Sequence, residues 1–423
     1  MYLKHITIEN FKGHTCCTLN LKPAFTLLIG DNGMGKTSIL EAAAVALGGF
    51  LAGVPDISTN HFKKDDIRIT QIPMGEGSFH RQYETPVRVS AVAQIEEEEY
   101  KWTRCKTSEK ATRSTVDPDA IKEIAKRLSR DPEGVLPVLS YQSAARLWMD
   151  RGEKMENIFH TAFNRTAGYV NCLKGTADTK ALLNWCAKME QVAWQKGKKI
   201  GEYESVKNTL SRFMCAMNEG EEVQIQFDKQ NSELSYVAGD MALPIGNLSA
   251  GYQSMIWMVL DIAFRMAVLN PNLMEKASDS PGIVLIDELD MHLHPNWQWK
   301  IIGALQKVFP NVQFIAATHS PILIASYKKG QLIQVERDEI LYLDSGYGLE
   351  INDVLRSAQG SQDMAASLKE QLDMLYNLID QGEFQEAKET VSVLEKELGA
   401  DHPEVNKVKT ALTFETAVAK EGI

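Results

Sequence analysis

The chain has 423 residues, which is enough for two or three domains with a large core. Its 45 basic and 56 acidic side chains give a net charge of −11, which argues against a protein that coats DNA uniformly but is compatible with a local basic groove. The six cysteines lack CxxC spacing, so they predict neither a zinc ribbon nor a disulfide framework. The sequence also shows no secretory signal and no uninterrupted apolar run of about 18 residues. We therefore expect a cytoplasmic protein that does not contact a membrane.

The first motif follows a short apolar strand. The run "FTLLIG" ends at Gly30, "DNGMGKTS" follows it, and "SILEAAAVALGG" is typical of a helix. This is the strand, glycine loop and helix of a P-loop, G-x-x-x-x-G-K-[ST]. Glycines let backbone N–H groups surround phosphate oxygens, a lysine charges the β- and γ-phosphate site, and a threonine hydroxyl binds Mg²⁺. The predicted ATP-binding residues of this loop are Gly30, Asn32, Gly33, Gly35, Lys36, Thr37 and Ser38, with Thr37 also a magnesium ligand.

The middle of the chain changes from strands to helices. Residues 66–105 contain the strand patterns "RITQI", "VRVSAVAQI" and "YKWTRC", and residues 143–218 are mostly helical in pattern. The helical part carries the basic stretch "WQKGKKIGEYESVK", which is either a solvated helix face or a nucleic-acid contact.

A second motif, "NLSAGYQS", precedes a long apolar helix pattern. Met255, Val259, Ile262 and Met266 fall on one face of this helix, and Ser249 is a suitable N-cap residue. An ordinary capped helix explains the pattern as well as a binding turn does.

Two carboxylates end the next apolar run. "GIVLIDE" predicts a strand of a parallel sheet, buried on both faces, that ends in Asp287 and Glu288. In a P-loop enzyme Asp287 would hold Mg²⁺ and Glu288 would act as the general base for the attacking water. The following residues, "LDMHLHPNW", pose the question of a zinc site at His292 and His294. Two histidines supply only two of the four ligands of a closed zinc site.

A fourth motif, "FIAATHSP", predicts another buried strand that ends in Thr318 and His319. A polar side chain at this strand end lies where doubly wound sheets gather their ligands.

These motifs together resemble the ATP-binding head of ABC, SMC and RecF-type ATPases, over residues 1 to about 345. The resemblance implies an α/β P-loop head with a mixed sheet, an antiparallel β lobe, a helical insert and an α-helical C-terminal tail. It implies that Ser249 and Gly251 bind the γ-phosphate held by a second copy, that His319 contacts the γ-phosphate as a catalytic residue beside Glu288, and that Gln142 touches Mg²⁺ and the nucleotide. Lys12 and His14 would also approach the nucleotide. The loop after Glu288, including both histidines, would run along the dimer interface. The cofactors implied are ATP and Mg²⁺.

Four segments follow from this resemblance. Residues 1–142 carry the P-loop and the antiparallel lobe, and residues 143–220 form a helical insert. Residues 221–345 carry the signature turn with Ser249 and Gly251, the Walker B strand that ends in Asp287, and the histidine switch at His319. Residues 346–423 form a helical tail. The chain between Lys36 and Asp287 is too long for a transporter ATPase subunit and too short for an SMC coiled coil.

The tail carries a helical pattern through Leu368, Leu372, Leu375 and Ile379 and resembles one TPR-like unit. A single unit of this kind cannot bury its apolar face alone, so we expect it to pack on the head, on another subunit or on a partner. The segment "VERDEILYLDSG" predicts a closing strand pair, and we find no sequence signature of a Toprim or HNH nuclease.

The combination most resembles the OLD-like ATPases of bacterial anti-phage defence, and among them the PtuA family of the Septu system. This resemblance implies a homo-oligomer built from ATP-sandwich dimers and an HNH endonuclease partner of the PtuB kind. The alternative is a RecF-like DNA-repair ATPase that binds DNA directly.

Overall fold

In a computed structural model of the chain, the described residues are 1–74, 79–147, 164–175, 179–220, 222–228, 231, 233–344, 346–348, 350–351, 353–354, 366–400 and 402–421. The chain divides into two compact units, Met1–Val354 and Leu355–Ile423, which we call the head and the tail. The segments 1–142, 143–220 and 221–345 all belong to the head. Residues 148–163 of the predicted helical insert lie outside the described residues.

The head is built on a six-stranded mixed sheet. Its strands, in spatial order, are β16 (Glu339–Leu343), β15 (Gln331–Glu336), β3 (Thr26–Ile29), β14 (Val312–Ala317), β13 (Gly282–Ile286) and β9 (Val138–Gln142). Only β16 is antiparallel to its neighbour, which confirms the predicted closing strand pair. The carboxyl ends of β3, β9, β13 and β14 therefore meet at one edge. The P-loop after β3, the carboxylates after β13, His319 after β14 and Gln142 at the end of β9 therefore lie at that edge, because these strands pair in parallel.

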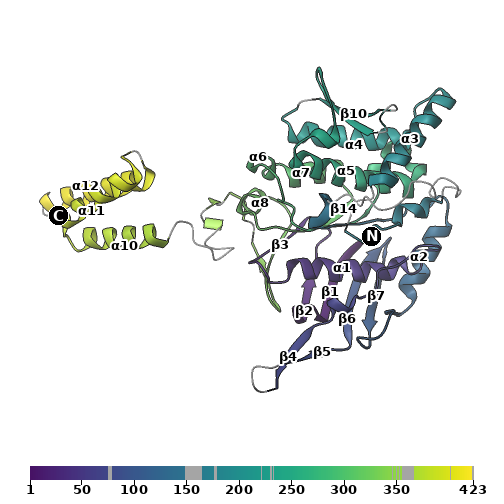
Figure 1. Cartoon of the computed structure of the whole chain (residues 1–423), viewed down its shortest axis with the longest axis horizontal. Helices are drawn as coiled ribbons and strands as arrows, with labels where there is room; N and C mark the ends of the chain where they lie inside the picture. Colours follow the sequence, from purple (N-terminus) through teal and green to yellow (C-terminus); the bar gives the residue numbers. More distant parts are fainter. Residues whose placement is uncertain are drawn as a thin grey trace. The chain divides into compact units, whose positions relative to one another are not determined.

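Every residue of β13 and β14 is buried, as their continuous apolar runs predict for strands covered on both faces. Figure 1 shows the core sheet between two layers of the head. On one side lies α1 (Lys36–Leu51) with an antiparallel sheet, and on the other lies a helical layer with α4 (Gly201–Met217), α5 (Ala250–Leu269) and α7 (Ile301–Val308).

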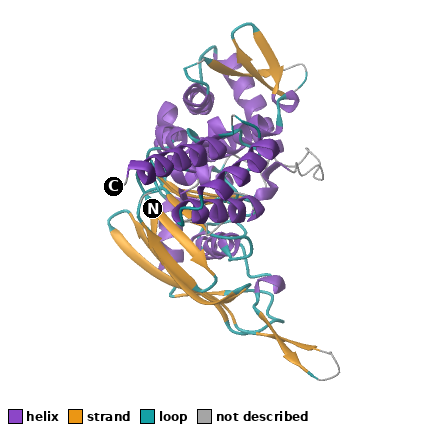
Figure 2. Ribbon diagram, turned by 90° about the vertical axis from the view of Figure 1, so that its left-hand side faces the viewer, coloured by secondary structure: helices purple, strands orange, loops and turns teal. Residues whose placement is uncertain are grey.

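The antiparallel lobe confirms the strands predicted over residues 66–105. Its five-stranded sheet consists, in spatial order, of β2 (His14–Asn20), β1 (Tyr2–Phe11), β6 (Val87–Ile95), β7 (Glu98–Lys106) and β8 (Thr115–Asp117). A separate hairpin of β4 (Ile69–Pro73) and β5 (Phe79–Tyr83) projects from this lobe, as Figure 2 shows. The lobe is fixed to α1 by Trp102, whose indole Nε1 donates to the Ala46 carbonyl at 2.9 Å.

The described part of the head also contains further helices and a small sheet. They include α2 (Ala120–Arg130), α3 (Thr179–Lys196), α8 (Pro321–Ser326), and the three antiparallel strands β10 (Val223–Asp228), β11 (Glu233–Ala238) and β12 (Met241–Pro244). Helix α5 is long and apolar enough to cross a membrane, but 89% of its apolar window is buried inside the protein. It is therefore the core helix of the head, buried on all sides rather than on the one face that the periodicity predicts.

The tail folds into three helices, α10 (Ala366–Asp380), α11 (Phe384–Leu398) and α12 (Pro403–Glu421). Their apolar faces form a core of Leu372, Leu375, Ile379, Ala387, Val391, Leu394, Val405, Val408 and Leu412. The tail therefore buries this apolar face within its own core, which the sequence pattern did not predict, while docking of the tail on another subunit or a partner stays a prediction. A two-helix unit leaves one face open, and α12 covers that face.

Candidate functional site

A cavity of about 220 Å³ lies at the carboxyl edge of the core sheet. Its lining consists of Asn32, Gly33, Gly35, Lys36, Thr37, Ser38, Asp287, Glu288, Ala317 and His319. Nine of these ten residues were predicted site residues, and the tenth, Ala317, is the last residue of β14. Segments more than 250 positions apart in the chain therefore build one site.

The P-loop has the backbone that phosphate binding requires. Gly30, Gly33 and Gly35 have φ angles of 132°, 81° and 98°, a region that side chains with a Cβ rarely adopt. The Lys36 ammonium donates to the carbonyl oxygens of Gly30 at 2.8 Å and Asp31 at 2.9 Å. The loop thus holds its lysine in place at the N-terminus of α1, where the helix dipole favours an anion.

Two of the three residues predicted to bind magnesium, Thr37 and Asp287, are brought together in the cavity. The Thr37 hydroxyl donates to Asp287 Oδ1 at 3.0 Å, which places a hydroxyl and a buried carboxylate side by side. Oxygen ligands of this kind suit Mg²⁺, which prefers one or two carboxylates together with phosphate oxygens and water. The donor set therefore fits a magnesium ion bound with a nucleotide.

Glu288 occupies an exposed position with a left-handed backbone, φ 47°. A non-glycine residue in this region carries a strain of about 1–3 kcal/mol, which is common at functional sites. The loop is pinned on both sides of Glu288, because Asp287 N donates to the Gln142 carbonyl at 2.8 Å and Leu289 N donates to the Ala317 carbonyl at 3.0 Å. This geometry presents the Glu288 carboxylate to the cavity, as its predicted role as a general base requires.

His319 enters the cavity from the end of β14. Its backbone N–H donates to Asp290 Oδ1 at 3.4 Å, and the Thr318 hydroxyl donates to the same oxygen at 2.5 Å. Asp290 therefore ties the loop after β13 to the histidine segment. Asp290 belongs to the motif after β13, but the sequence pattern alone indicates no function for it.

Burial and the neighbouring charges set the protonation states. Burial lowers the pKa of Lys36, while the carboxylates of Asp287, Asp31, Asp290 and Glu288 oppose that shift. Burial, followed by the Lys36 charge, lowers the pKa of His319, so its ring is neutral at neutral pH. A neutral histidine donates through one ring nitrogen without adding a second positive charge beside Lys36.

Gln142 ends β9, where its carbonyl accepts from Asp287 N, but its side chain does not line the cavity. Its amide lies buried against Ser140 and Asp261. Gln142 is therefore a backbone neighbour of the predicted magnesium ligand Asp287, while its side-chain amide is held by Ser140 and Asp261.

The signature turn lies outside the cavity lining. Ser249 takes the N-cap position of α5, as predicted, but among the described residues its side chain makes no capping hydrogen bond. Gly251 is buried against the loop after β13, where an added Cβ would lie 2.4 Å from the carbonyl oxygen of His292. Glycine is required here by this close approach, and the exposed Ser249 is not occupied by capping the helix.

Lys12 and His14 do not line the cavity, contrary to the expectation that they approach the nucleotide. The Lys12 ammonium pairs with Glu41, and it lies 3.9 Å from Asp66. The ring of His14 is buried behind the P-loop, with Nε2 3.2 Å from the Gly35 carbonyl oxygen. Lys12, in the turn between β1 and β2, therefore contacts α1, and His14, the first residue of β2, contacts the P-loop.

The two histidines of "DMHLHPNW" have structural explanations. His294 Nδ1 accepts from Asn296 N at 3.3 Å and so caps the short helix α6 (Pro295–Gln298). His292 adopts φ 62° and presents its carbonyl to Gly251. The loop is therefore shaped to meet the signature turn of its own chain.

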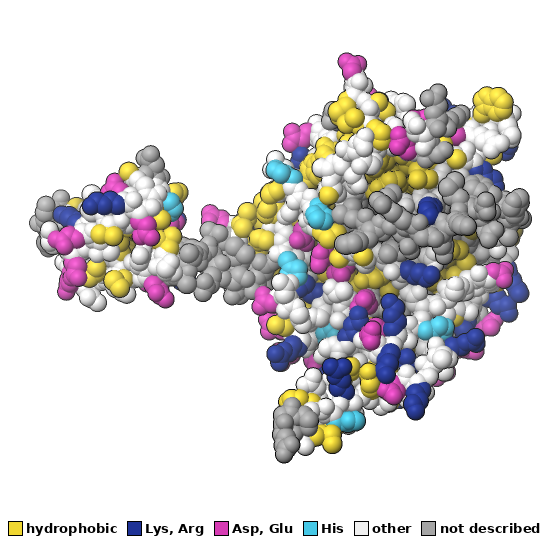
Figure 3. All heavy atoms as spheres, in the orientation of Figure 1, with side chains coloured by type: hydrophobic (Ala, Val, Ile, Leu, Met, Phe, Trp, Pro, Cys, Tyr) yellow, Lys and Arg dark blue, Asp and Glu magenta, His cyan; other side chains and the backbone are white. Residues whose placement is uncertain are grey.

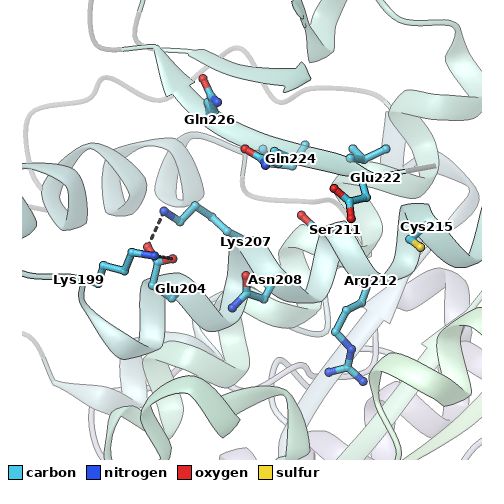
Figure 4. A pocket seen from close by; sticks show the side chains of 12 residues that line it. Lys199, Glu204, Lys207, Asn208, Ser211, Arg212, Cys215, Glu222, Gln224 and Gln226 are labelled. Atoms are coloured by element: carbon cyan, nitrogen blue, oxygen red, sulfur yellow. Dashed lines mark ion pairs between the residues drawn. The ribbon is translucent and has the colours of Figure 1, made fainter. Parts of the chain in front are cut away.

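A larger groove of about 600 Å³ lies between α4 and β10, away from the P-loop (Figure 4). Lys199 and Lys207 of the basic stretch both pair with Glu204, at 3.8 and 2.6 Å. Because Glu204 offsets these charges, the groove favours the solvated helix face over the nucleic-acid contact for this stretch.

Comparisons with known proteins agree with this fold and site. An "AAA domain" family model matches residues 5–236, and a second AAA domain model matches residues 267–325. The chain is 25% identical to "Retron Vc95 probable ATPase" of Vibrio cholerae over 358 residues, 73% of this chain and 68% of that protein. It is 34% identical to "Septu protein PtuA" of Bacillus mycoides over 166 residues, but these cover 38% of this chain and only 23% of that protein.

Among solved structures, an SMC head bound to the C-terminal winged-helix domain of ScpA aligns with a TM-score of 0.50 at 17% identity, covering 81% of this chain and 98% of that one. Fold and site together define an ABC/SMC-type P-loop ATPase head. The chain belongs to the AAA domain family, and it is related to the retron ATPases and to Septu PtuA.

Proposed function

We propose that this chain is the ATP-binding and ATP-hydrolysing regulatory subunit of an anti-phage defence complex. It assembles through ATP-sandwich dimers and controls a separate HNH-type nuclease. In the hydrolysis step, Glu288 accepts a proton from water as the water oxygen attacks the γ-phosphorus, and the bond to the β–γ bridging oxygen breaks to release ADP. Lys36 and His319 line the cavity and would contact the phosphates, and Thr37 and Asp287 would hold the Mg²⁺ that offsets the phosphate charge.

One observation carries the dimer part of the proposal. The cavity gathers the P-loop, Asp287, Glu288 and His319 from one chain but leaves Ser249 and Gly251 outside. A serine and a glycine at the N-terminus of a helix are suited to bind a phosphate, but the ATP cavity of the same chain does not reach Ser249 and Gly251. A second copy supplies that phosphate if its P-loop faces this turn.

The defence role rests on the relatives. The matches to a retron ATPase and to Septu PtuA support an ATPase in an anti-phage system, and the partner nuclease is our extension from that likeness. In this proposal the partner nuclease cleaves the nucleic acid, and the nucleotide bound to this chain determines when the nuclease is active.

The test is purification of the tagged chain expressed from its own locus. We expect an HNH endonuclease to co-purify, and we expect ATP to shift the head from monomer to dimer in mass photometry. Ser249→Arg should abolish the ATP-dependent dimer because a bulky cation blocks the facing P-loop. Ser108→Arg, the same change at an exposed loop serine, is the control. An ATP-dependent dimer that survives Ser249→Arg would refute the sandwich.

A second candidate function, direct nucleic-acid binding, is favoured by one feature of the surface. In a chain of net charge −11, Lys and Arg side chains gather over the antiparallel lobe in Figure 3. Exposed members of this group are Lys63, Lys64, Arg81, Arg88, Lys101, Lys110 and Arg113.

We expect the combined change Lys63→Glu, Lys64→Glu and Arg81→Glu to weaken duplex DNA binding about 10-fold or more if this surface contacts phosphates, because each neutralised phosphate steepens the salt dependence. Fluorescence anisotropy between 50 and 200 mM salt measures it. Charge reversal at Lys196, Lys198 and Lys199 is the control. Binding that is absent at low salt, or equal in the two triple variants, rules the second function out.

A further inference from the structure

Helix α5 carries a polar pair in its apolar interior. Asp261 and Arg265 are one helical turn apart, 4% and 2% exposed, in a helix whose other residues from Met255 to Leu269 are all apolar and buried. Burying an ion pair costs desolvation, and it is stabilising only where further hydrogen bonds satisfy both partners. The contacts of this pair therefore indicate what it is for.

One oxygen of Asp261 collects three donors. Asp261 Oδ2 accepts from Gln142 Nε2 at 2.7 Å, from Arg265 Nε at 2.9 Å and from the Ser140 hydroxyl at 3.4 Å. Gln142 and Ser140 belong to β9, so the carboxylate joins the helix that begins at the signature turn to the strand that ends beside Asp287.

This contact fixes the orientation of the Gln142 amide. A carboxylate only accepts hydrogen bonds, so the amide nitrogen must face Asp261. The same nitrogen donates to Ser140 Oγ at 2.8 Å, which uses both of its hydrogens. The carbonyl oxygen Oε1 is left on the other side of the amide. Within the described part of the chain, Oε1 is buried and accepts no hydrogen bond.

A buried acceptor without a partner costs about 1–3 kcal/mol, so it needs an explanation. Gln142 is the sheet neighbour of Ile286, and its backbone carbonyl accepts from Asp287 N. The unsatisfied oxygen therefore belongs to a residue adjacent to the predicted magnesium ligand. An amide oxygen is a ligand type that Mg²⁺ and its bound water accept.

Arg265 extends the connection to a segment inside the helical insert. Its Nη1 donates to the carbonyls of Gly168 and Val170, both at 2.9 Å. Gly168 lies so close to α5 that an added Cβ would be 2.6 Å from Leu269 Cγ. The pair thus locks α5, β9 and the insert segment together at one point.

We propose that Asp261 is a positioning residue that holds the Gln142 carbonyl oxygen toward the magnesium side of the ATP site, with Arg265 fixing Asp261. The inference rests on the proposed function. Without the carboxylate, the amide nitrogen and oxygen of Gln142 compete for the same space, and half of the possible orientations present the wrong group to the metal. The signature helix of each chain then sets the metal affinity of that chain's own ATP site.

The experiment measures binding, in a Glu288→Gln background that prevents turnover. The test variant is Asp261→Leu with Arg265→Met, which removes both charges and so leaves no unpaired ion in the core. We expect the Mg²⁺ concentration for half-maximal ATP binding to rise about 10-fold, the scale of lost outer-shell support at metal sites. ATP binding in EDTA should change less than about 2-fold, a ratio below 0.5 kcal/mol. A merely structural role would weaken both equally.

The dependence on Gln142 gives a second readout. In a Gln142→Leu background the same double change should produce no further shift in the Mg²⁺ requirement, because the side chain that Asp261 positions is gone. Additive shifts would overturn the inference. So would an unchanged Mg²⁺ requirement in a folded double variant.

If the double variant does not fold, Asp261→Asn decides. Asn keeps an oxygen but accepts more weakly, and a shift seen only when Gln142 is present supports the inference, whereas an equal shift or none in both backgrounds overturns it. If the parent binds ATP without any Mg²⁺ dependence, the proposed site falls together with this inference. If ATP binding depends on Mg²⁺ in the parent and in the variants to the same extent, only this inference is wrong.

Discussion

Replacing Glu288 by Gln is expected to slow ATP hydrolysis by about 1,000-fold while ATP remains bound, because general-base catalysis contributes about 10²–10⁴-fold. Glutamine keeps the size of the side chain and tolerates the φ of 47° as glutamate does, so the loop retains its shape. Only the ability to accept a proton is lost. Single-turnover hydrolysis with radiolabelled ATP measures the rate, and filter binding measures retention.

Glu97→Gln is the control, since this exposed residue lies in the turn between β6 and β7. We also expect ATP to hold Glu288→Gln in the dimer, because the sandwich persists until its nucleotide is cleaved. If Glu288→Gln turns over at the parent rate, Glu288 is not the base.

Replacing Lys36 by Ala should weaken ATP binding by about 100-fold, or roughly 3 kcal/mol, as expected when one partner of a desolvated charge pair is removed. Lys36 is 5% exposed and its ammonium donates to the carbonyls of Gly30 and Asp31, so it is already placed at the predicted phosphate site. Alanine keeps α1 intact because it is the best helix former. Isothermal titration calorimetry with ATP and Mg²⁺ measures the loss.

Lys101→Ala, at an exposed position on β7, is the matched control. Lys36→Ala should also lack the ATP-dependent dimer, since no nucleotide bridges the two heads. ATP affinity equal to that of the parent would show that this P-loop does not bind the triphosphate.

Much of the ATP site was predictable because its parts are local. The strand before Gly30, the positive-φ glycines and the lysine at the start of α1 lie within a few residues of one another, so a contiguous pattern specifies the phosphate cradle. The buried runs of β13 and β14 were predictable for a related reason. Strands covered on both faces are continuously apolar, and their polar ends mark the edge where a site forms.

Other features differ from the predictions because contacts with segments distant in the sequence determine them. His14 was expected near the nucleotide, yet its ring is buried behind Gly35 because β2 runs under the P-loop. Ser249 takes the predicted N-cap position of α5, yet within the described part of the chain its side chain makes no capping hydrogen bond. The tail was expected to be unable to bury its apolar face alone, yet α12 completes a core within the tail.

The sequence by itself determined the phosphate loop, the two carboxylates after β13, the histidine after β14 and the parallel strands that carry them. These features depend on residue type and short-range spacing, which a linear pattern contains. Only the tertiary structure decided that Asp261 holds Gln142 across 119 positions, that Gly251 fits against His292, and that the signature turn stays outside its own chain's cavity. Contacts of this kind depend on how strands and helices pack, and no local pattern in one sequence encodes the distance between two such residues.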